Sequence, residues 1–219
     1  GLGGGRMHSP FGPAPSGFLR VPSYYDYRSM FGEASNSAVL SAQFMEKVIQ
    51  QEGPSSVAAI IAEPILGSGG HVDPQKEWWA LVSEIAKKYN ILLIVDEVMT
   101  GFCRTGKMFA SENYDLKPDI LTMAKGITAS VLPFGAVAFS EEIYAAFEGK
   151  PFPHGFTFTA HPVCSRRLRS AAPMKPVAPV RASVRGMGFI ANRRTSLPRS
   201  VGMIAGEISL QKALGVLRE

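Results

Sequence analysis

Apolar runs that alternate with amphipathic stretches between residues 57 and 147 predict strands that alternate with helices. Continuous apolar runs, which are typical of strands buried on both faces, span 57–62, 91–95, 120–124 and 134–139. Helical spacing of apolar residues predicts helices over 36–52 and 75–89, and a short helix with an acidic start over 141–147. This order of elements predicts an α/β fold with a mixed, mostly parallel sheet flanked by helices.

The helix over 75–89 has the clearest predicted boundaries. Asp73 is expected to cap its start, with Pro74 at the first helical position. Asn90 is expected to end it, because asparagine tolerates the left-handed backbone conformation. Its buried face is expected to comprise Trp78, Leu81, Val82, Ile85 and Tyr89. The apolar side chains that predict the helix over 36–52 are Val39, Phe44, Val48 and Ile49.

The segments on either side of this pattern lack regular periodicity. Residues 1–34 are rich in Gly, Pro, Ser and Tyr, which favours an irregular segment. Pro and Arg interrupt residues 166–206 repeatedly, so that only a strand or turn over 184–190 is expected there, and apolar periodicity returns over 201–217. We therefore expect three parts: an irregular segment over 1–34, a core over 35–165 and a basic segment over 166–219.

The formal net charge of +5 is unevenly distributed along the 219 residues. Residues 1–165 carry 12 basic and 16 acidic side chains, whereas residues 166–206 carry nine basic and no acidic ones. The chain is thus an acidic-leaning body followed by one basic segment. Because that segment contains no DNA- or RNA-binding motif, we expect no nucleic-acid partner.

Composition also limits the cellular compartments in which the protein is expected. The two cysteines, Cys103 and Cys164, cannot build a disulfide framework, and no secretory apolar segment is present. No apolar run approaches the roughly 20 residues that a membrane span needs. We therefore expect an intracellular protein of the cytoplasm or the mitochondrial matrix, without a membrane partner.

Three predicted strands are each followed by a charged residue: Glu63, Asp96 and Lys125. Strands that leave a core often end in charges, so one such residue alone carries little weight. Ligands of open α/β sheets, however, bind beyond the carboxyl ends of the strands. A lysine beside a carboxylate in such a place suits imine chemistry with an aldehyde cofactor. No metal site is expected, because His154 and His161 have no Cys or carboxylate cluster beside them.

Five motifs in the core carry a family resemblance. They are AAIIAEP at 58–64, GSGG at 67–70, ILLIVDEVMTGFCRTGKMFA at 91–110, KPDILTMAKG at 117–126 and HGFTFTAHP at 154–162. In order and spacing they resemble the class III aminotransferases, a subgroup of the fold-type-I enzymes that use pyridoxal 5′-phosphate (PLP) and often act on ω-amino groups. The resemblance implies an incomplete large domain of that fold type.

The resemblance also implies roles for five residues. Lys125 would hold PLP as a Schiff base and then move the substrate proton. Asp96 would pair with the pyridinium nitrogen of PLP and keep it protonated. Val98 would lie against the face of the cofactor ring, two residues further along the strand. Thr157 would bind a cofactor phosphate, that of the partner subunit, and Glu63 would lie near the active site, next to the residues that contact the cofactor.

The activity implied is transfer of an amino group from an amine or ω-amino acid to a 2-oxo acid such as pyruvate or glyoxylate. The family forms homodimers with shared active sites, so a second copy is the expected partner. An aminomutase or a decarboxylase of the same fold stays open as an alternative. So does a non-catalytic fragment whose basic segment binds an acidic partner, which would bind in a salt-sensitive manner.

Parts of the family pattern are missing. Residues 1–56 lack the Gly-Ser/Thr-x-Ala segment with which the family holds the PLP phosphate at a helix N-terminus. Downstream, SVRGMGFIA at 183–191 and VGMIAGEISL at 201–210 resemble only the entry to the family's C-terminal small domain. We interpret the sequence as a partial or spliced coding sequence that leaves the family's register after Cys164. These residues alone are therefore expected to bind PLP poorly and turn over slowly or not at all.

Overall fold

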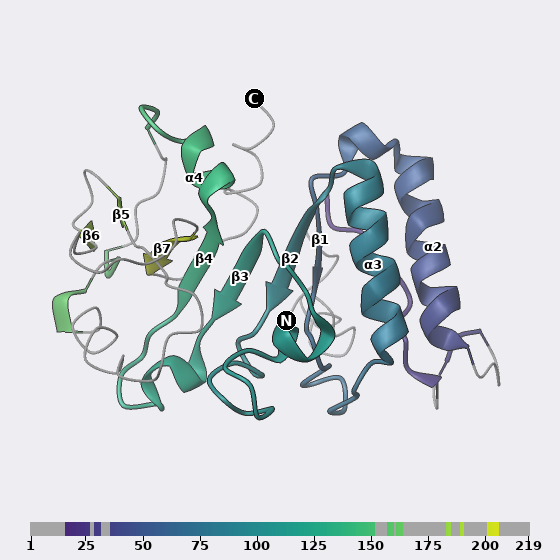
Figure 1. Cartoon of the computed structure of the whole chain (residues 1–219), viewed down its shortest axis with the longest axis horizontal. Coiled ribbons are helices and arrows are strands. Elements are labelled where there is room, and N and C mark those ends of the chain that lie inside the picture. Colours follow the sequence, from purple (N-terminus) through teal and green to yellow (C-terminus); the bar gives the residue numbers. More distant parts are fainter. Residues whose placement is uncertain are drawn as a thin grey trace. The chain divides into compact units, whose positions relative to one another are not determined.

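The computed structural model describes residues 16–26, 29–31, 36–151, 157–159, 161–163, 183–184, 189–190 and 201–205. Its main sheet has five strands in the order β1-β2-β3-β4-β7 (Figure 1). They are β1 (Ala59–Ala62), β2 (Leu92–Asp96), β3 (Ile120–Met123), β4 (Ala136–Ser140) and β7 (Val201–Ala205). The four strands predicted between residues 57 and 139 are confirmed, each with boundaries shifted by no more than two residues.

Strand directions confirm the mixed, mostly parallel sheet. β1, β2 and β3 pair in parallel, β4 runs antiparallel to β3, and β7 runs antiparallel to β4. Four of the five strands therefore share one direction. A separate antiparallel pair, β5 (Ser183–Val184) and β6 (Phe189–Ile190), falls on the predicted strand or turn over 184–190. The remaining residues of the predicted irregular segment 166–206 lie outside the described residues, apart from those in β7.

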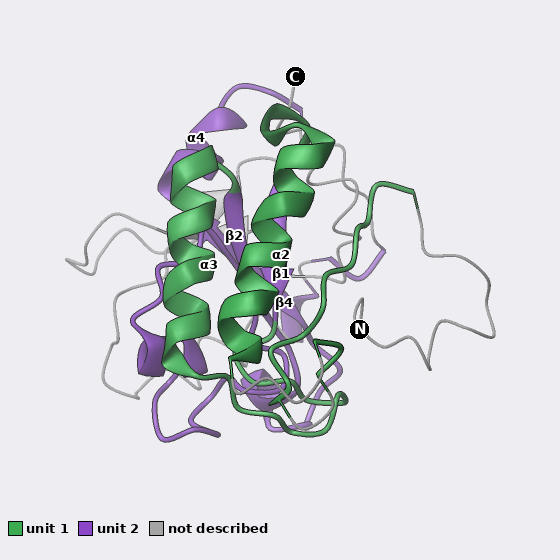
Figure 2. Ribbon diagram, turned by 90° about the vertical axis from the view of Figure 1, so that its right-hand side faces the viewer, with its two compact units in different colours: residues 1–57, 63–91 green, residues 58–62, 92–219 purple. Residues whose placement is uncertain are grey.

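The chain divides into two compact units, shown in different colours in Figure 2. Unit 1 comprises Gly1–Val57 and Glu63–Ile91, and unit 2 comprises Ala58–Ala62 and Leu92–Glu219. Unit 1 contains the two long helices, α2 (Ser37–Glu52) and α3 (Lys76–Tyr89), and the short 3-10 helix η3 (Pro54–Ser56). The predicted segment boundaries after residues 34 and 165 fall outside the described residues and stay predictions.

Helix α2 confirms the helix predicted over 36–52, but of the four apolar residues that predicted it only Ile49 is fully buried. Phe44 is 39% exposed, whereas the buried positions are Ser37, Ala38, Ser41, Ala42, Met45 and Ile49. The small side chains of this face admit the indole of Trp78 from α3, whose Nε1 donates a hydrogen bond to Ser41 Oγ (3.0 Å). Close packing of the two helices thus favours small residues at the position where the indole of Trp78 enters.

Helix α3 begins at Lys76, one residue after the predicted start, and Pro74 is not its first helical position. Asp73 and Pro74 precede the helix, and Gln75 has an extended backbone and no capping hydrogen bond from its side chain. The amide Nε2 of Gln75 donates instead to Asp26 Oδ2 (2.9 Å), which holds this segment extended. The predicted end is confirmed, because Asn90 takes the left-handed conformation with φ of 53°. Of the predicted face, Trp78, Val82 and Ile85 are buried, and Leu81 and Tyr89 are half-buried.

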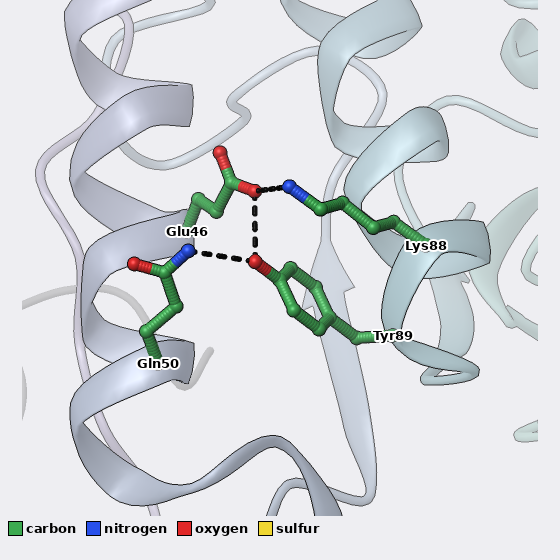
Figure 3. Close-up of polar contacts among 4 residues, drawn as sticks. All are labelled: Glu46, Gln50, Lys88 and Tyr89. Carbon is green, nitrogen blue, oxygen red and sulfur yellow. Dashed lines mark hydrogen bonds and ion pairs between the residues drawn. The ribbon is translucent and has the colours of Figure 1, made fainter.

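At one end of the two helices, a polar network joins α2 to α3 (Figure 3). Glu46 Oε1 accepts hydrogen bonds from Lys88 Nζ (2.7 Å) and from the Tyr89 hydroxyl (2.9 Å). The amide Nε2 of Gln50 donates to the same hydroxyl oxygen (2.7 Å). The bond from Lys88 lowers the pKa of the Glu46 carboxyl. Because the side chain of Lys88 is 60% exposed, this pair orients the helices more than it stabilises them.

Tyr24 closes the hairpin that contains the GSGG motif. Its hydroxyl accepts a hydrogen bond from the Leu66 N–H (3.2 Å) and donates one to the Val72 carbonyl (3.2 Å). Leu66 and Val72 also pair with each other through backbone bonds of 2.9 and 3.0 Å. The phenol is 5% exposed and its ring lies 4.6 Å from that of Trp78. Burial therefore raises the pKa of Tyr24 above its ordinary value of 10.0, against the opposing effect of the Leu66 bond.

The core of unit 2 lies on both faces of the sheet, because successive strand residues point to opposite sides. One cluster centres on Met123, Ile127, Ala136 and Ala138, with Phe102, Phe109, Leu121 and Phe134 packed against it. The other joins Ile94 and Ile120 to Ile143 of α4 (Glu141–Ala146), the short helix predicted over 141–147. Ser140 Oγ caps α4 by accepting from the Ile143 N–H (3.3 Å). None of the helices in the described ranges has the length and apolar character needed to cross a bilayer.

The buried phenol of Tyr24 generates a pH-dependent prediction. Tyr24→Phe removes two hydrogen bonds, but the Leu66 N–H and the Val72 carbonyl stay paired with each other, so the free energy of unfolding should fall by about 0.5–1.5 kcal/mol near pH 8. A raised folded-state pKa means that the phenol's contribution is fully present below about pH 10 and is lost at higher pH. The difference between wild type and Tyr24→Phe should therefore shrink above about pH 10. Urea unfolding of both proteins at several pH values measures it.

Tyr144→Phe is the matched control, because Tyr144 is a half-buried tyrosine outside this network. Its stability difference from wild type should be small at the lower pH. A Tyr24→Phe difference that stays constant from pH 8 to pH 11 would contradict the assignment.

Candidate active site

Asp96 is the last residue of β2, and Lys125 comes two residues after the end of the neighbouring strand β3. The two strands run in parallel, with Asp96 in register with Thr122, three residues before Lys125. The N–H of Glu97 donates to the Thr122 carbonyl (2.9 Å), which extends the pairing past the end of β2. The sheet thus confirms that these two predicted residues belong to the carboxyl ends of neighbouring parallel strands, where α/β folds place their ligands.

Asp96 is half-buried and has one oxygen committed locally. Its Oδ1 accepts the N–H of Val98 (2.9 Å), which forms a tight turn directly after the strand. Its Oδ2 has no hydrogen-bond partner among the described residues. The prediction that Val98 lies two residues further along the strand is wrong, because β2 ends at Asp96 and Val98 lies in the turn that follows. Contact of Val98 with a cofactor ring stays a prediction.

Lys125 stands at the start of η5 (Lys125–Thr128), in a backbone conformation that favours glycine. Its φ is +47°, in the left-handed region, although it carries a long side chain. Such strain is maintained only where the surroundings fix the backbone, and it is concentrated at functional sites. The side chain is exposed, and the structure gives it no ion pair within the described ranges.

Glycine at position 126 allows η5 to approach the neighbouring loop. A Cβ atom at Gly126 would lie 2.9 Å from Phe102 Cβ and 3.3 Å from the Gly101 carbonyl oxygen. Phe102 is itself fixed by an edge-on contact with Phe109, with ring centroids 5.6 Å apart. The backbone next to Lys125 therefore packs directly against the loop that follows Asp96.

Sequence reasoning missed the residue that organises this loop. Glu97 is completely buried, and its carboxylate accepts hydrogen bonds from Thr100 Oγ1 and from the N–H groups of Ala110 and Ser111. The two N–H groups belong to the start of η4 (Ala110–Tyr114). The available signal was the Asp96-Glu97 pair itself, because adjacent strand residues face opposite sides and only one of the two can face a ligand.

The structure gives no hydrogen bond, within the described ranges, between the Asp96–Lys125 pair and the other two predicted site residues, Glu63 and Thr157. Glu63 follows β1 in the chain but belongs to unit 1, where its Oε2 accepts the N–H of Gly67 (2.8 Å). Thr157 is exposed and lies in a turn. Within the described ranges, no group of three or more His, Cys, Asp or Glu side chains could hold a metal ion, and His154 lies outside them.

Comparison with protein families identifies the chain. The model of the family described as Aminotransferase class-III matches residues 3–170. The chain belongs to the class-III aminotransferase family. Its fold is accordingly that of the fold-type-I transaminases, with the large-domain sheet incomplete.

Similar proteins agree with this assignment. Gamma-aminobutyrate transaminase 1, mitochondrial, of Oryza sativa subsp. indica is 40% identical over 147 residues, which cover 65% of this chain and 28% of the relative. A thermostable (S)-enantioselective omega-transaminase from Thermomicrobium roseum is 41% identical with a TM-score of 0.68, over 74% of this chain and 37% of that one. This aminotransferase chain thus spans less than a third of the length of that rice relative.

Class-III transaminases use PLP, and one similar structure contains the aminated form of that cofactor. The omega transaminase from Pseudomonas jessenii in complex with PMP is 34% identical with a TM-score of 0.66, over 71% of this chain and 36% of that one. The residues present here fit the group. Asp96 keeps an uncommitted carboxylate oxygen for a protonated ring nitrogen, and exposed Lys125 offers an amine at the neighbouring strand end.

The close approach at Gly126 generates a stability prediction. Gly126→Ala should lower the free energy of unfolding by about 1–3 kcal/mol, because the new methyl group overlaps Phe102 Cβ and the Gly101 carbonyl oxygen. Gly135→Ala is the control, since a Cβ there meets its nearest atom, the Met123 carbonyl oxygen, at 3.4 Å. That variant should be neutral or slightly stabilised. Equal urea midpoints for the two variants would show that η5 does not pack closely against the loop.

Proposed function

We propose that this chain is the catalytic core of a PLP-dependent aminotransferase that moves an amino group from an amine or ω-amino acid to a 2-oxo acid such as pyruvate or glyoxylate. The observation that carries the proposal is the placement of Asp96 and Lys125 at the ends of two parallel strands paired in register, in a chain of this family. A carboxylate and an amine at that edge of the sheet are the two groups that PLP chemistry needs from a protein.

Asp96 would hold the cofactor ring through its charge. Its Oδ1 is occupied by the Val98 N–H, which fixes the carboxylate plane and leaves Oδ2 for the pyridinium nitrogen. An ionised carboxylate at that nitrogen keeps the ring protonated. When bound, PLP would accept the electron pair left behind when the substrate loses a proton.

Lys125 would hold the cofactor covalently and then act as the acid–base group. Its Nζ would take the proton from the substrate carbon that carries the amino group and return it on the cofactor side. The strained backbone at Lys125 and the wall formed by Phe102 against Gly126 would limit where that nitrogen can go.

Three further assignments complete the proposed site. Val98 would cover one face of the ring from the turn after β2. Thr157 would bind the cofactor phosphate of a partner subunit, in a homodimer with shared sites. Glu63, whose Oε2 accepts the Gly67 N–H, would be a supporting residue that does not itself react.

The names of similar proteins support the donor class. Relatives are named as gamma-aminobutyrate transaminases and neighbours as omega-transaminases, which points to donors with a terminal amino group. The rice relative is also named as mitochondrial, which supports the mitochondrial matrix over the cytoplasm as the compartment. Turnover by these residues alone is expected to be slow, so the measurement compares relative rates: alanine should form from pyruvate faster with β-amino and γ-amino donors than with α-amino donors. Faster transfer from α-amino acids would contradict this donor class.

Selective covalent capture of PLP at Lys125 tests the proposal. The full chain would be incubated with PLP, reduced with borohydride and digested, and the modified lysines located by mass spectrometry. We expect modification at Lys125 at lower PLP concentration than at Lys117, an exposed lysine of the same unit. Asp96→Asn should raise the concentration needed about tenfold or more, because it removes the charge that holds the ring nitrogen.

Lys117→Arg is the matched control for Lys125→Arg. The first variant should keep the captured cofactor, and the second should lose it. Modification spread evenly over the exposed lysines, unaffected by Asp96→Asn, would overturn the proposed function.

A further inference from the structure

Glu97 is a buried carboxylate held without a cation. Its side chain is 0% exposed, and within the described part of the chain the structure gives it no ion pair. Its partners are instead three hydrogen-bond donors: Thr100 Oγ1, the Ala110 N–H (3.1 Å) and the Ser111 N–H (2.7 Å). A charge buried in this way is costly unless all its donors stay in place. The surrounding backbone is therefore specified closely.

Both carboxylate oxygens are used. Oε1 accepts from the Ser111 N–H, and Oε2 accepts from the Ala110 N–H and from the Thr100 hydroxyl. The carboxylate thus ties the turn at 98–101 to the start of η4, closing a loop of residues 97–111. An amide side chain of the same size could not replace it, because its NH₂ group would face a backbone N–H.

The same residue contacts the strands and the loop through its backbone. Its N–H donates to the Thr122 carbonyl of β3 (2.9 Å), and its own carbonyl accepts from the Gly101 N–H (2.9 Å). Gly101 leads directly into Phe102, which stands against Gly126. A continuous set of contacts therefore runs from Glu97 through the loop to the residue after Lys125.

We propose that Glu97 is a positioning residue that sets the relative placement of Asp96 and Lys125. It is adjacent to Asp96 in the chain, and it fixes the loop that supports η5 at Gly126. This inference rests on the proposed function for the roles of Asp96 and Lys125. The placement itself, however, is a property of the chain without cofactor and can be measured there.

Hydrogen–deuterium exchange of the full chain provides the test. In η5 the N–H of Ile127 donates to the Ala124 carbonyl (3.1 Å) and that of Ala129 to the Gly126 carbonyl (3.1 Å), so exchange of these amides reports the integrity of the turn at Lys125. Glu97→Gln should raise exchange about tenfold in peptides covering both 97–111 and 124–129. Amides of α2 and α3 should be unchanged.

Glu112→Gln is the matched control. Glu112 is the other carboxylate of this part of the chain that caps η4, through one hydrogen bond from the Phe109 N–H (2.9 Å), and it is half-buried. Its variant can keep that bond through the amide oxygen, so exchange at 124–129 should match wild type. Thr100→Val and Thr100→Ser form a milder pair: the first should raise exchange at 124–129 and the second should restore it.

The pattern of exchange distinguishes a specific effect of Glu97 on the turn at Lys125 from a local or a global loss of stability. Exchange that rises only within 97–111, or equally throughout both units, overturns the inference. If Glu97→Gln does not fold, the two Thr100 variants decide by the same comparison. Borohydride capture of PLP at Lys125 is the second readout, and it should need about tenfold more PLP in Thr100→Val than in Thr100→Ser. Absence of capture in the wild type would count against the proposed function alone, since the exchange result stands without PLP.

Discussion

The parallel pairing of β2 with β3 is the constraint on which the candidate site depends. Residues 94–96 pair in register with residues 120–122, and the bond from the Glu97 N–H to the Thr122 carbonyl carries the alignment past the strand end. A slip of one residue would turn Asp96 to the other face of the sheet. The chemistry proposed for Asp96 and Lys125 therefore depends on main-chain hydrogen bonds between two short strands, more than on any contact of the two side chains.

A second layer of order comes from the loop that connects these strands. Polar groups organise its interior through the Glu97 carboxylate, and aromatic groups organise its outer contact through Phe102 and Phe109. The hydrogen bonds of Glu97 and the aromatic contact differ in what their loss would cost. Loss of an aromatic contact leaves a gap that neighbours can partly fill, whereas loss of one of the three donors leaves a buried carboxylate oxygen with fewer partners and no water to replace them. This difference makes the polar half of the loop the more sensitive to substitution.

The sequence predicted the parts of this structure that follow from period and composition. Apolar runs predicted β1 to β4 but not β7, and Asn90 predicted the end of α3, because a backbone propensity acts locally. The start of α3 was misplaced because a distant partner, Asp26, holds Gln75 extended. Periodicity did not indicate that Phe44 of α2 is exposed, because small residues line the face of the helix on which the indole of Trp78 packs. In the candidate site, charge at strand ends indicated Asp96 and Lys125, but the partners of Glu97 lie 13 and 14 residues away and leave no periodic trace.

The interleaving of the two units along the chain has a consequence for how this protein can be divided. Unit 2 takes Ala58–Ala62 from the middle of unit 1, so that the polypeptide changes units three times. No single cut yields either unit intact, and the pairing of β1 with β2 encloses residues 63–91 in a closed loop. The entropic cost of closing that loop is smaller if residues 63–91 are already folded. Formation of α3 should therefore favour the pairing of β1 with β2. A minimal version of the sheet would have to be built by circular permutation or by grafting β1 onto another part of the chain.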